Sequence, residues 1–178
     1  MEVFKDFYAD KTLAKYNTKG YDKADRALLE EISTPYQYNI KSGKIIGNHQ
    51  GAHFYTIGQR KGLNIGGHIE SIFVISTDVD KNIIYVGEGQ SHPGLYRKGL
   101  FINEKEIHWI RPDLKMVDGE VRDYLVRIRY RQPLQRGRLF KAQNGLYIVF
   151  DEPQRGITPG QFAAWYSGEE MLGSGVIS

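Results

Sequence analysis

The first part of the chain places hydrophobic residues three or four positions apart, which is the spacing of one face of a helix. The residues that follow this spacing are Phe4, Phe7 and Tyr8, and then Ala24, Leu28 and Ile32. Asp22 is a suitable N-cap for the second run. Pro35 ends that run, because the residue before a proline avoids the helical conformation. The pattern predicts short helices over residues 1–32.

From residue 36 the period of the pattern changes to two, which is typical of strands. Short β-rich runs cover residues 36–40, 51–57, 71–78, 82–87 and 99–102. Residues 78–82 lie between two apolar runs and are typical of a hairpin loop. Many short strands at this spacing favour a small barrel or a sandwich.

A second β-rich block follows, with runs over residues 123–132, 137–142, 146–150, 161–166 and 170–177. Asn144-Gly145 is a strong hairpin signal, and residues 167–169 are a second expected turn. Five strands this close together favour a closed barrel, since closure removes exposed edges. Pro112, Asp118 and Gly119 mark the expected boundary. We therefore predict a mainly β chain of three parts: a helical connecting segment (1–35), a central β-rich domain (36–112) and a C-terminal β-barrel (113–178).

The composition narrows the chemistry available to these 178 residues, which include no cysteine. Disulfide scaffolds, cysteine-ligated zinc, iron–sulfur clusters and cysteine nucleophiles are excluded within them. No apolar run is long enough to span a bilayer, and no signal peptide is evident. We expect a soluble, cytoplasmic protein without membrane contact.

The net charge is only +3, but positive charge is concentrated in residues 122–138, which hold six arginines and one aspartate. Within that segment Arg127, Arg129 and Arg131 alternate with Ile128 and Tyr130. On one strand the three arginines would share a face. Guanidinium groups pair with phosphate, so the stripe suggests a nucleic-acid partner. The alternative is an outward face neutralised by acids such as Glu120 or Asp123, and Tyr130 could stack on a base or belong to the core.

A glycine-rich loop over residues 58–67 carries a cationic tip at Arg60 and Lys61. It lacks the order of a phosphate-binding loop of the Walker type. Glycines would allow close approach to a phosphate backbone. The other interpretation is a tight turn with solvated tips.

Residues suited to catalysis or metal binding are sparse. His49 and His53 are four apart, but glycines surround them and no third ligand is evident, so we predict no metal site. Asp151 and Glu152 are adjacent and would point to opposite sides of an extended chain, so they do not form an acid–base pair. We predict no catalytic residue in this chain.

Several motifs resemble the tRNA-specific 2-thiouridylases. Ile128-Arg129-Tyr130-Arg131-Gln132-Pro133 is one, and Thr158-Pro159-Gly160-Gln161 is another. The other matching segments are residues 53–67, 83–89 with 92–93, 150–153 and 172–177. They follow the family order over residues 36–178.

The resemblance implies an N-terminal ATP-pyrophosphatase domain, a central β-rich domain and a C-terminal β-barrel, of which this chain resembles the last two. Family members place sulfur on C2 of the wobble uridine of tRNA, with ATP, Mg²⁺ and a cysteine persulfide. A sulfur-relay protein or cysteine desulfurase supplies that sulfur. The nucleotide loop and catalytic cysteines are absent from these residues, so we expect the chain alone to be inactive and to bind no cofactor.

The resemblance also implies which residues contact tRNA: Arg129, Tyr130, Arg131 and Gln161. For Gln59, Arg60 and Lys61 two roles stay open, namely contact with the tRNA backbone or ordering of the catalytic loop of the absent domain. The alternative to tRNA binding is a scaffolding β-module that supports a catalytic domain or receives a sulfur-relay partner.

Overall fold

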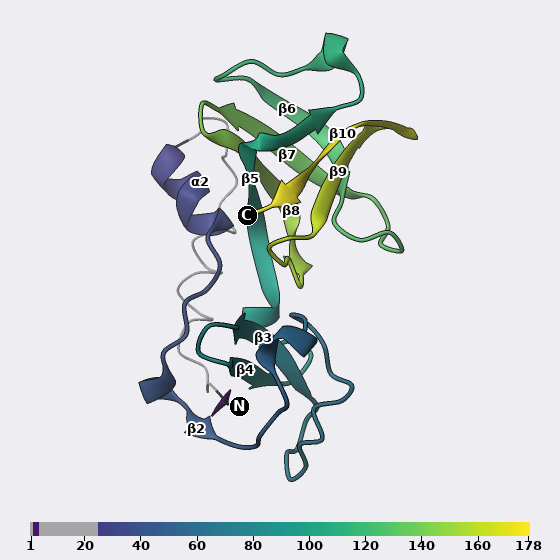
Figure 1. The fold of residues 1–178 in the computed structure, drawn as a ribbon. Coiled ribbons are helices and arrows are strands. Elements are labelled where there is room, and N and C mark those ends of the chain that lie inside the picture. Colours follow the sequence, from purple (N-terminus) through teal and green to yellow (C-terminus); the bar gives the residue numbers. More distant parts are fainter. Residues whose placement is uncertain (1, 4–24) are drawn as a thin grey trace. The chain divides into compact units, whose positions relative to one another are not determined.

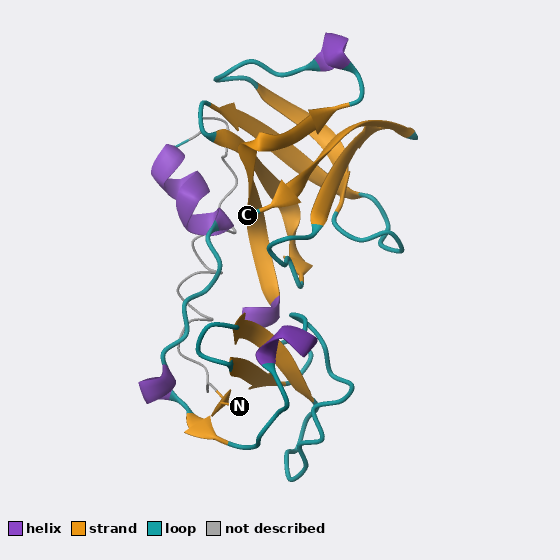
Figure 2. Ribbon diagram, in the orientation of Figure 1, coloured by secondary structure: helices purple, strands orange, loops and turns teal. Residues whose placement is uncertain are grey.

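The computed structural model describes residues 2–3 and 25–178, and these form two compact units. Residues 2–3 and 35–96 belong to the central unit, and residues 25–34 and 97–178 belong to the barrel unit. Strands dominate both units (Figures 1 and 2). The expected mainly β chain with a short helical segment before its β-rich parts is confirmed.

The central unit contains a sheet of four strands in the order β2-β1-β4-β3. Its elements are β1 (Glu2–Val3), η1 (Ile40–Ser42), β2 (Lys44–Ile45), η2 (Ala52–Phe54), β3 (Ile72–Asp78), β4 (Ile83–Glu88) and η3 (Pro93–Leu95). The predicted hairpin between residues 78 and 82 is confirmed, because β3 and β4 pair antiparallel on either side of it. Asn82 in that turn has a φ of 54°.

Both faces of the β3–β4 hairpin are covered. Ile72, Val74, Ile84 and Val86 pack on one face with Ala52 and Leu63, whereas Phe73, Ile75 and Tyr85 pack with Leu95. A strand buried on both sides needs apolar residues at successive positions, which explains the continuous run from Ile72 to Ile75.

Two predicted strands of the central unit are wrong. Residues 36–40 and 51–57 contain only the short 3-10 helices η1 and η2. Hydrogen bonds that involve side chains hold these segments instead. The Tyr36 hydroxyl donates to the Tyr96 carbonyl, and the Ala52 N–H donates to the side-chain Oδ1 of Asn82 at 2.8 Å. Burial against the sheet therefore produces an apolar pattern without strand pairing.

The helical prediction over residues 1–32 is confirmed in part. Helix α2 (Arg26–Ser33) begins after Asp25, whose carboxylate accepts from the Ala27 N–H, so Asp25 is the N-cap instead of Asp22. The helix ends at Ser33, with Thr34 as its C-cap before Pro35, as expected. Glu2 and Val3 form strand β1 instead of helix, and the remainder of the prediction (residues 4–24) lies outside the described residues.

The barrel unit is a closed barrel in the order β10-β5-β8-β7-β6-β9. Its elements are β5 (Tyr96–Trp109), η4 (Pro112–Leu114), β6 (Val121–Arg127), β7 (Gln135–Ala142), β8 (Gly145–Arg155), β9 (Phe162–Ser167) and β10 (Glu170–Ile177). The hairpin turns predicted at Asn144-Gly145 and at residues 167–169 join β7 to β8 and β9 to β10. The barrel core includes the fully buried Trp165, Phe150, Leu139 and Ile148.

The structure divides earlier along the chain than the predicted boundary at residues 112–113. The barrel unit resumes at Arg97, because β5 pairs with β10 through Ile102 and Trp109 and closes the barrel. The cluster around Pro112 is the connection between two barrel strands, where η4 lies. Turn residues show where a strand ends, but they do not tell a loop within one domain from a linker between two domains.

Helix α2 also belongs to the barrel unit instead of forming a connecting segment. Leu29 and Ile32 are each only 4% exposed. The buried Arg97 guanidinium donates to the Ser33 carbonyl at 2.9 Å and to the Ile157 carbonyl at 3.0 Å. One side chain thus joins the end of α2 to the segment that follows β8. Among the described residues, no helix is long and apolar enough to cross a membrane.

Candidate nucleic-acid interface

The candidate site lies where strands β6 and β9 pair at one end of the barrel (Figure 1). Arg127 of β6 lies opposite Ala164 of β9, and Val126 lies opposite Trp165. Val126 and Trp165 are fully buried in the barrel. Because side chains alternate along a strand, Arg127, Ala164 and their neighbours at positions 162 and 166 face outward.

The predicted stripe of three arginines on one strand is wrong. Strand β6 ends at Arg127, not at Gln132, and the next residues form a turn in which the Arg129 carbonyl accepts from the Gln132 N–H at 3.1 Å. The last pair of β6 with β9 is Arg127 with Ala164, and the last pair of β6 with β7 is Val126 with Gln135. The strand therefore ends before the second and third arginines of the stripe. Ile128 still points inward and is 3% exposed, as the alternation predicted.

This turn and the start of β9 border one open hollow of about 550 Å³. Of the four residues assigned to tRNA by the resemblance, Arg129, Tyr130 and Gln161 line this hollow, whereas Arg131 is exposed on the turn and does not. The others that line it include Arg127, Phe162 and Tyr166. The structure thus brings together three predicted residues from segments 30 positions apart.

Two arginines of the hollow are held by neutral groups. Arg129 Nη2 donates to the Gly156 carbonyl at 2.9 Å, and Arg127 Nη1 donates to the Tyr130 carbonyl at 3.3 Å. Burial, with the nearby charge of Arg155 as a smaller cause, lowers the pKa of Arg129 from its ordinary value. The Arg127 guanidinium also lies 5.6 Å from the centroid of the Tyr166 ring, as in a cation–π contact.

Within the described part of the chain, the arginines around the hollow have no acidic partner. Among the described residues, no carboxylate forms an ion pair with Arg127, Arg129 or Arg131. Neutralisation by Glu120 and Asp123 does occur, but for Arg122 and Arg138, at 2.9 and 2.6 Å. In the arginine-rich segment, Arg122 and Arg138 therefore form ion pairs with acids. Arg127 and Arg129, which line the hollow, form none among the described residues, so a phosphate would be attracted there.

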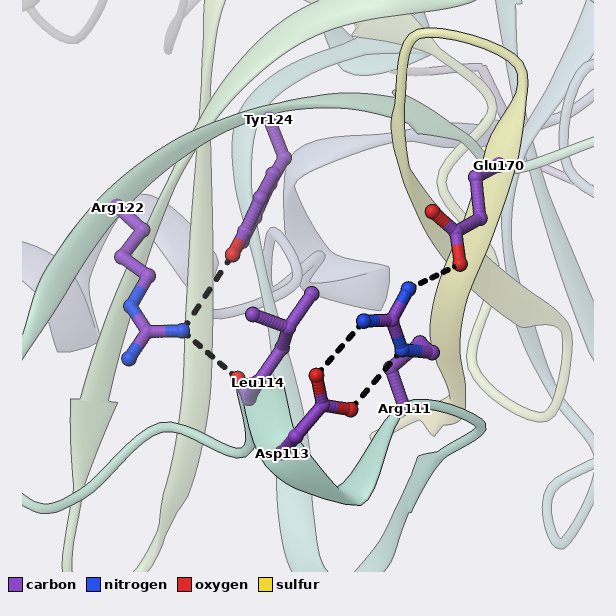
Figure 3. Close-up of polar contacts among 6 residues, drawn as sticks. All are labelled: Arg111, Asp113, Leu114, Arg122, Tyr124 and Glu170. Atoms are coloured by element: carbon purple, nitrogen blue, oxygen red, sulfur yellow. Dashed lines mark hydrogen bonds and ion pairs between the residues drawn. The ribbon is translucent and has the colours of Figure 1, made fainter.

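Arg111 in the connection from β5 to β6 and Arg122 in β6 itself have a structural role (Figure 3). Arg111 donates two bonds to Asp113 and a third to Glu170, and these carboxylates raise its pKa. Arg122 Nη1 donates to the Leu114 carbonyl at 2.7 Å. These contacts tie η4 to β6 and to the β9–β10 turn.

Gln161 sits at the turn that precedes β9. Its carbonyl accepts from the Ile177 N–H at 2.8 Å, which fixes its backbone against β10, and Gly160 provides the positive φ of 84° that the turn requires. The Gln161 Oε1 atom is buried and has no hydrogen-bond partner among the described residues. An unsatisfied buried acceptor is costly, so this amide is suited to gaining a donor from a ligand.

Gln59, Arg60 and Lys61 belong to the central unit. Gln59 stabilises its own loop, because its Oε1 accepts from the Thr56 N–H at 3.1 Å and its Nε2 donates to the Lys61 carbonyl at 2.9 Å. Its backbone also pairs with Val74 of β3. Arg60 and Lys61 are exposed. Gln59 thus shapes the loop, and the two cations present their charge to solvent.

The described residues contain no cluster of metal ligands. No group of three or more His, Asp or Glu side chains in residues 2–3 and 25–178 could hold a metal ion. His49 is engaged locally, since its Nδ1 accepts from the Gly51 N–H at 3.1 Å.

The sequence patterns left some residues of the hollow unidentified. Phe162 and Tyr166 were predicted only as strand residues, and Arg127 only as a member of the stripe. Phe162, Ala164 and Tyr166 alternate along one strand with Ala163 and Trp165, which are buried. Placing Trp165 in the core would have put the rings of Phe162 and Tyr166 on the outer face.

Comparison with known proteins gives matches over both units. A family model described as "tRNA methyl transferase PRC-barrel domain" matches residues 33–88, and one described as "Aminomethyltransferase beta-barrel domain" matches residues 100–177. The chain is 51% identical over 172 residues to the tRNA-specific 2-thiouridylase MnmA of Flavobacterium johnsoniae, covering 95% of the chain and 43% of that protein.

Two further relatives carry the same name. The protein of Christiangramia forsetii is 54% identical over 84% of the chain, and that of Halalkalibacterium halodurans is 42% identical over 80%. The chain spans 38% of the length of each. The chain therefore spans less than half the length of each of these three relatives.

Proposed function

Because this chain belongs to the tRNA-specific 2-thiouridylase family and corresponds to its C-terminal portion, we propose that it binds the tRNA on which such an enzyme acts. The whole enzyme would place sulfur on C2 of the wobble uridine. The observation that carries the proposal is the hollow at the β6–β9 end of the barrel. There Arg129, Tyr130 and Gln161 gather beside arginines that have no ion pair among the described residues.

Binding would rest first on charge. The unpaired guanidinium groups of Arg127 and Arg129 flank the hollow, and Arg131 extends the positive edge along the exposed turn. Guanidinium pairs bidentately with phosphate oxygens and stacks on aromatic rings. Arg60 and Lys61 offer a second cationic loop on the central unit, for contact with the tRNA backbone or with a catalytic domain.

Sulfur transfer itself needs groups that these residues do not supply. The family chemistry uses ATP, Mg²⁺ and a persulfide carried by cysteine, and the 178 residues contain no cysteine. We assign those steps, and the sulfur-relay protein or cysteine desulfurase that feeds them, to the whole enzyme. The chain on its own would be inactive.

A titration of an unmodified tRNA transcript at several salt concentrations tests this function. The logarithm of the binding constant should fall linearly with the logarithm of salt concentration. Arg131→Ala should reduce the steepness of that slope by about 0.7–0.9, which corresponds to one lost phosphate contact. Lys105→Ala is the matched control, because Lys105 is equally exposed on the barrel but lies away from the hollow.

Arg129→Ala requires a second check, because Arg129 also holds the Gly156 carbonyl. Arg129→Lys keeps the charge, so it should restore more of the salt slope than it restores of the affinity. An unchanged slope in the Arg129→Ala, Arg131→Ala double variant would refute the role of these arginines.

One observation favours a second function for the central unit, which is scaffolding for a protein partner. Phe54 and Ile69 of this unit are exposed to 66% and 101%, and a protein partner could cover these apolar side chains. On this reading the folded chain would show no tRNA affinity even at low salt. Binding that depends on Arg131 would argue against it.

A further inference from the structure

Two aromatic rings border the hollow, and solvent reaches most of each. Tyr130 is 88% exposed and Phe162 is 64% exposed. Neither ring contacts another aromatic ring or a cation among the described residues. Exposed aromatic side chains are normally scattered singly over a surface. Two of them at one hollow indicate a ligand with an apolar face.

Both rings line the same hollow, although they come from different segments. Phe162 is the first residue of β9, and Tyr130 lies in the turn that follows β6, whose last pair with β9 is Arg127 with Ala164. The third ring of the hollow, Tyr166, differs from them because the Arg127 guanidinium lies over it. Tyr130 and Phe162 therefore have ring faces available for a ligand.

The charge around the rings identifies the class of ligand. Arg127 and Arg129 border the same hollow, and neither forms an ion pair among the described residues. A planar apolar ring joined to a phosphate matches both features, because aromatic side chains stack on bases and guanidinium groups pair with phosphate. A volume of about 550 Å³ is within the usual range of small-ligand sites.

We infer that this hollow binds one unstacked nucleobase, which stacks on Tyr130 and Phe162 while the phosphates beside it contact Arg129 and Arg127. The inference rests on the proposed tRNA-binding function and makes it specific, since it assigns a single-stranded nucleotide to this site and adds Phe162 to the binding residues. Bases within an A-form duplex are stacked and offer no free face, so the ligand must come from a loop, a bulge or an end.

The test measures binding of the full chain to two RNAs under the same salt conditions. One is an unmodified tRNA transcript with uridine at the wobble position, and the other is a blunt RNA duplex of similar length. Tyr130→Ala and Phe162→Ala should each weaken tRNA binding about 5- to 100-fold, as expected for a lost base–aromatic stack. The salt slope and the affinity for duplex should stay unchanged, because no charge is removed.

Three variants make the comparison specific. Phe54→Ala removes a phenyl ring with 66% exposure from the central unit and should leave tRNA affinity unchanged. Tyr130→Phe keeps the ring and should bind nearly as well as the original chain. Tyr130→Trp should lose fluorescence when tRNA binds, since the added indole would stack on a base, and the original chain, with Trp109 and Trp165 alone, gives the background to subtract.

The outcomes separate this inference from the function beneath it. Salt-dependent tRNA binding that neither Tyr130→Ala nor Phe162→Ala weakens would overturn the stacking site and leave the proposed function standing. An equal loss of duplex and tRNA affinity would also overturn it. If the unchanged chain bound no tRNA at low salt, both would be wrong. Thermal unfolding of each variant checks that the barrel is intact.

Discussion

Replacing the buried Arg97 by methionine should loosen helix α2 from the barrel. The guanidinium donates to the Ser33 carbonyl at 2.9 Å and to the Ile157 carbonyl at 3.0 Å, and the residue is 7% exposed. Methionine keeps much of the apolar stem but donates no hydrogen bond. Because a hydrogen bond to a charged group contributes about 1.5–3 kcal/mol, the two losses should lower the free energy of unfolding by about 3 kcal/mol or more.

Urea unfolding followed by tryptophan fluorescence measures this effect in the barrel unit alone, because both tryptophans, Trp109 and Trp165, lie in barrel strands. With an m-value of about 1.5 kcal/mol/M, a loss of about 3 kcal/mol lowers the midpoint by about 2 M. Hydrogen exchange at α2 amides should accelerate in parallel, since the helix would open more often.

Arg26→Met is the matched control on the same helix. Arg26 forms an exposed ion pair with Glu30, so its loss should change the free energy of unfolding far less than the loss of Arg97 does. If Arg97→Met shifted the midpoint no more than Arg26→Met, the two buried hydrogen bonds would not be what holds α2 to the barrel.

Three other predictions concern single sites. Gly173→Ala should cost about 3 kcal/mol, because the added Cβ would lie 2.6 Å from the His108 carbonyl oxygen, whereas Gly168→Ala meets no atom within 4 Å and should cost about 1 kcal/mol from its φ of 59°; equal midpoints in urea would contradict this. Burial by itself would lower the pKa of Lys141, but its hydrogen bonds and charge interactions with Asp118, at 2.7 Å, and with Glu104 together outweigh burial and raise that pKa. The contribution of charged Lys141 to the free energy of unfolding should therefore be fully present below pH 10.5 and disappear as the pH rises through the higher pKa of the folded state. The difference in unfolding free energy between the original chain and Lys141→Met should narrow over that rise. A constant difference from pH 8 to 11 would argue against this role. Gln59→Ala should accelerate hydrogen exchange at the Thr56 amide, which loses its acceptor, while Arg60→Ala should not; similar exchange in both would mean that Gln59 does not hold the loop.

The barrel strands could be predicted from the sequence because their signals are local. Residues 137–142 and 146–150 are largely buried short runs, and Asn144-Gly145 specifies the turn between them. The same local reasoning failed for residues 36–40 and 51–57. Their apolar side chains pack against the β3–β4 hairpin, and that burial does not require strand pairing.

The errors in the candidate site have a non-local cause. Residues 123–132 carry the same alternation throughout, yet β6 stops at Arg127, because its pairing with β9 ends at Ala164 and its pairing with β7 ends at Gln135. Only the pairing of segments far apart in the sequence sets that length. The resemblance nevertheless identified Arg129, Tyr130 and Gln161, which meet at one hollow, while Phe162 needed the register to be seen.

The position of Arg97 also makes residues 35–96 an insertion in the barrel unit. The chain leaves the barrel unit after residue 34 and returns at Arg97, whose guanidinium contacts Ser33, and a Cβ added to Gly99 would lie 3.2 Å from the Ile32 carbonyl oxygen. Exit and return are therefore neighbours, as in a domain placed into a surface loop of another. Replacing residues 35–96 by a short flexible linker would keep helix α2 on the barrel, although strand β1 would lose its partners β2 and β4. A cut at residue 96, by contrast, would leave the barrel without α2 and expose the surface that Leu29 and Ile32 cover.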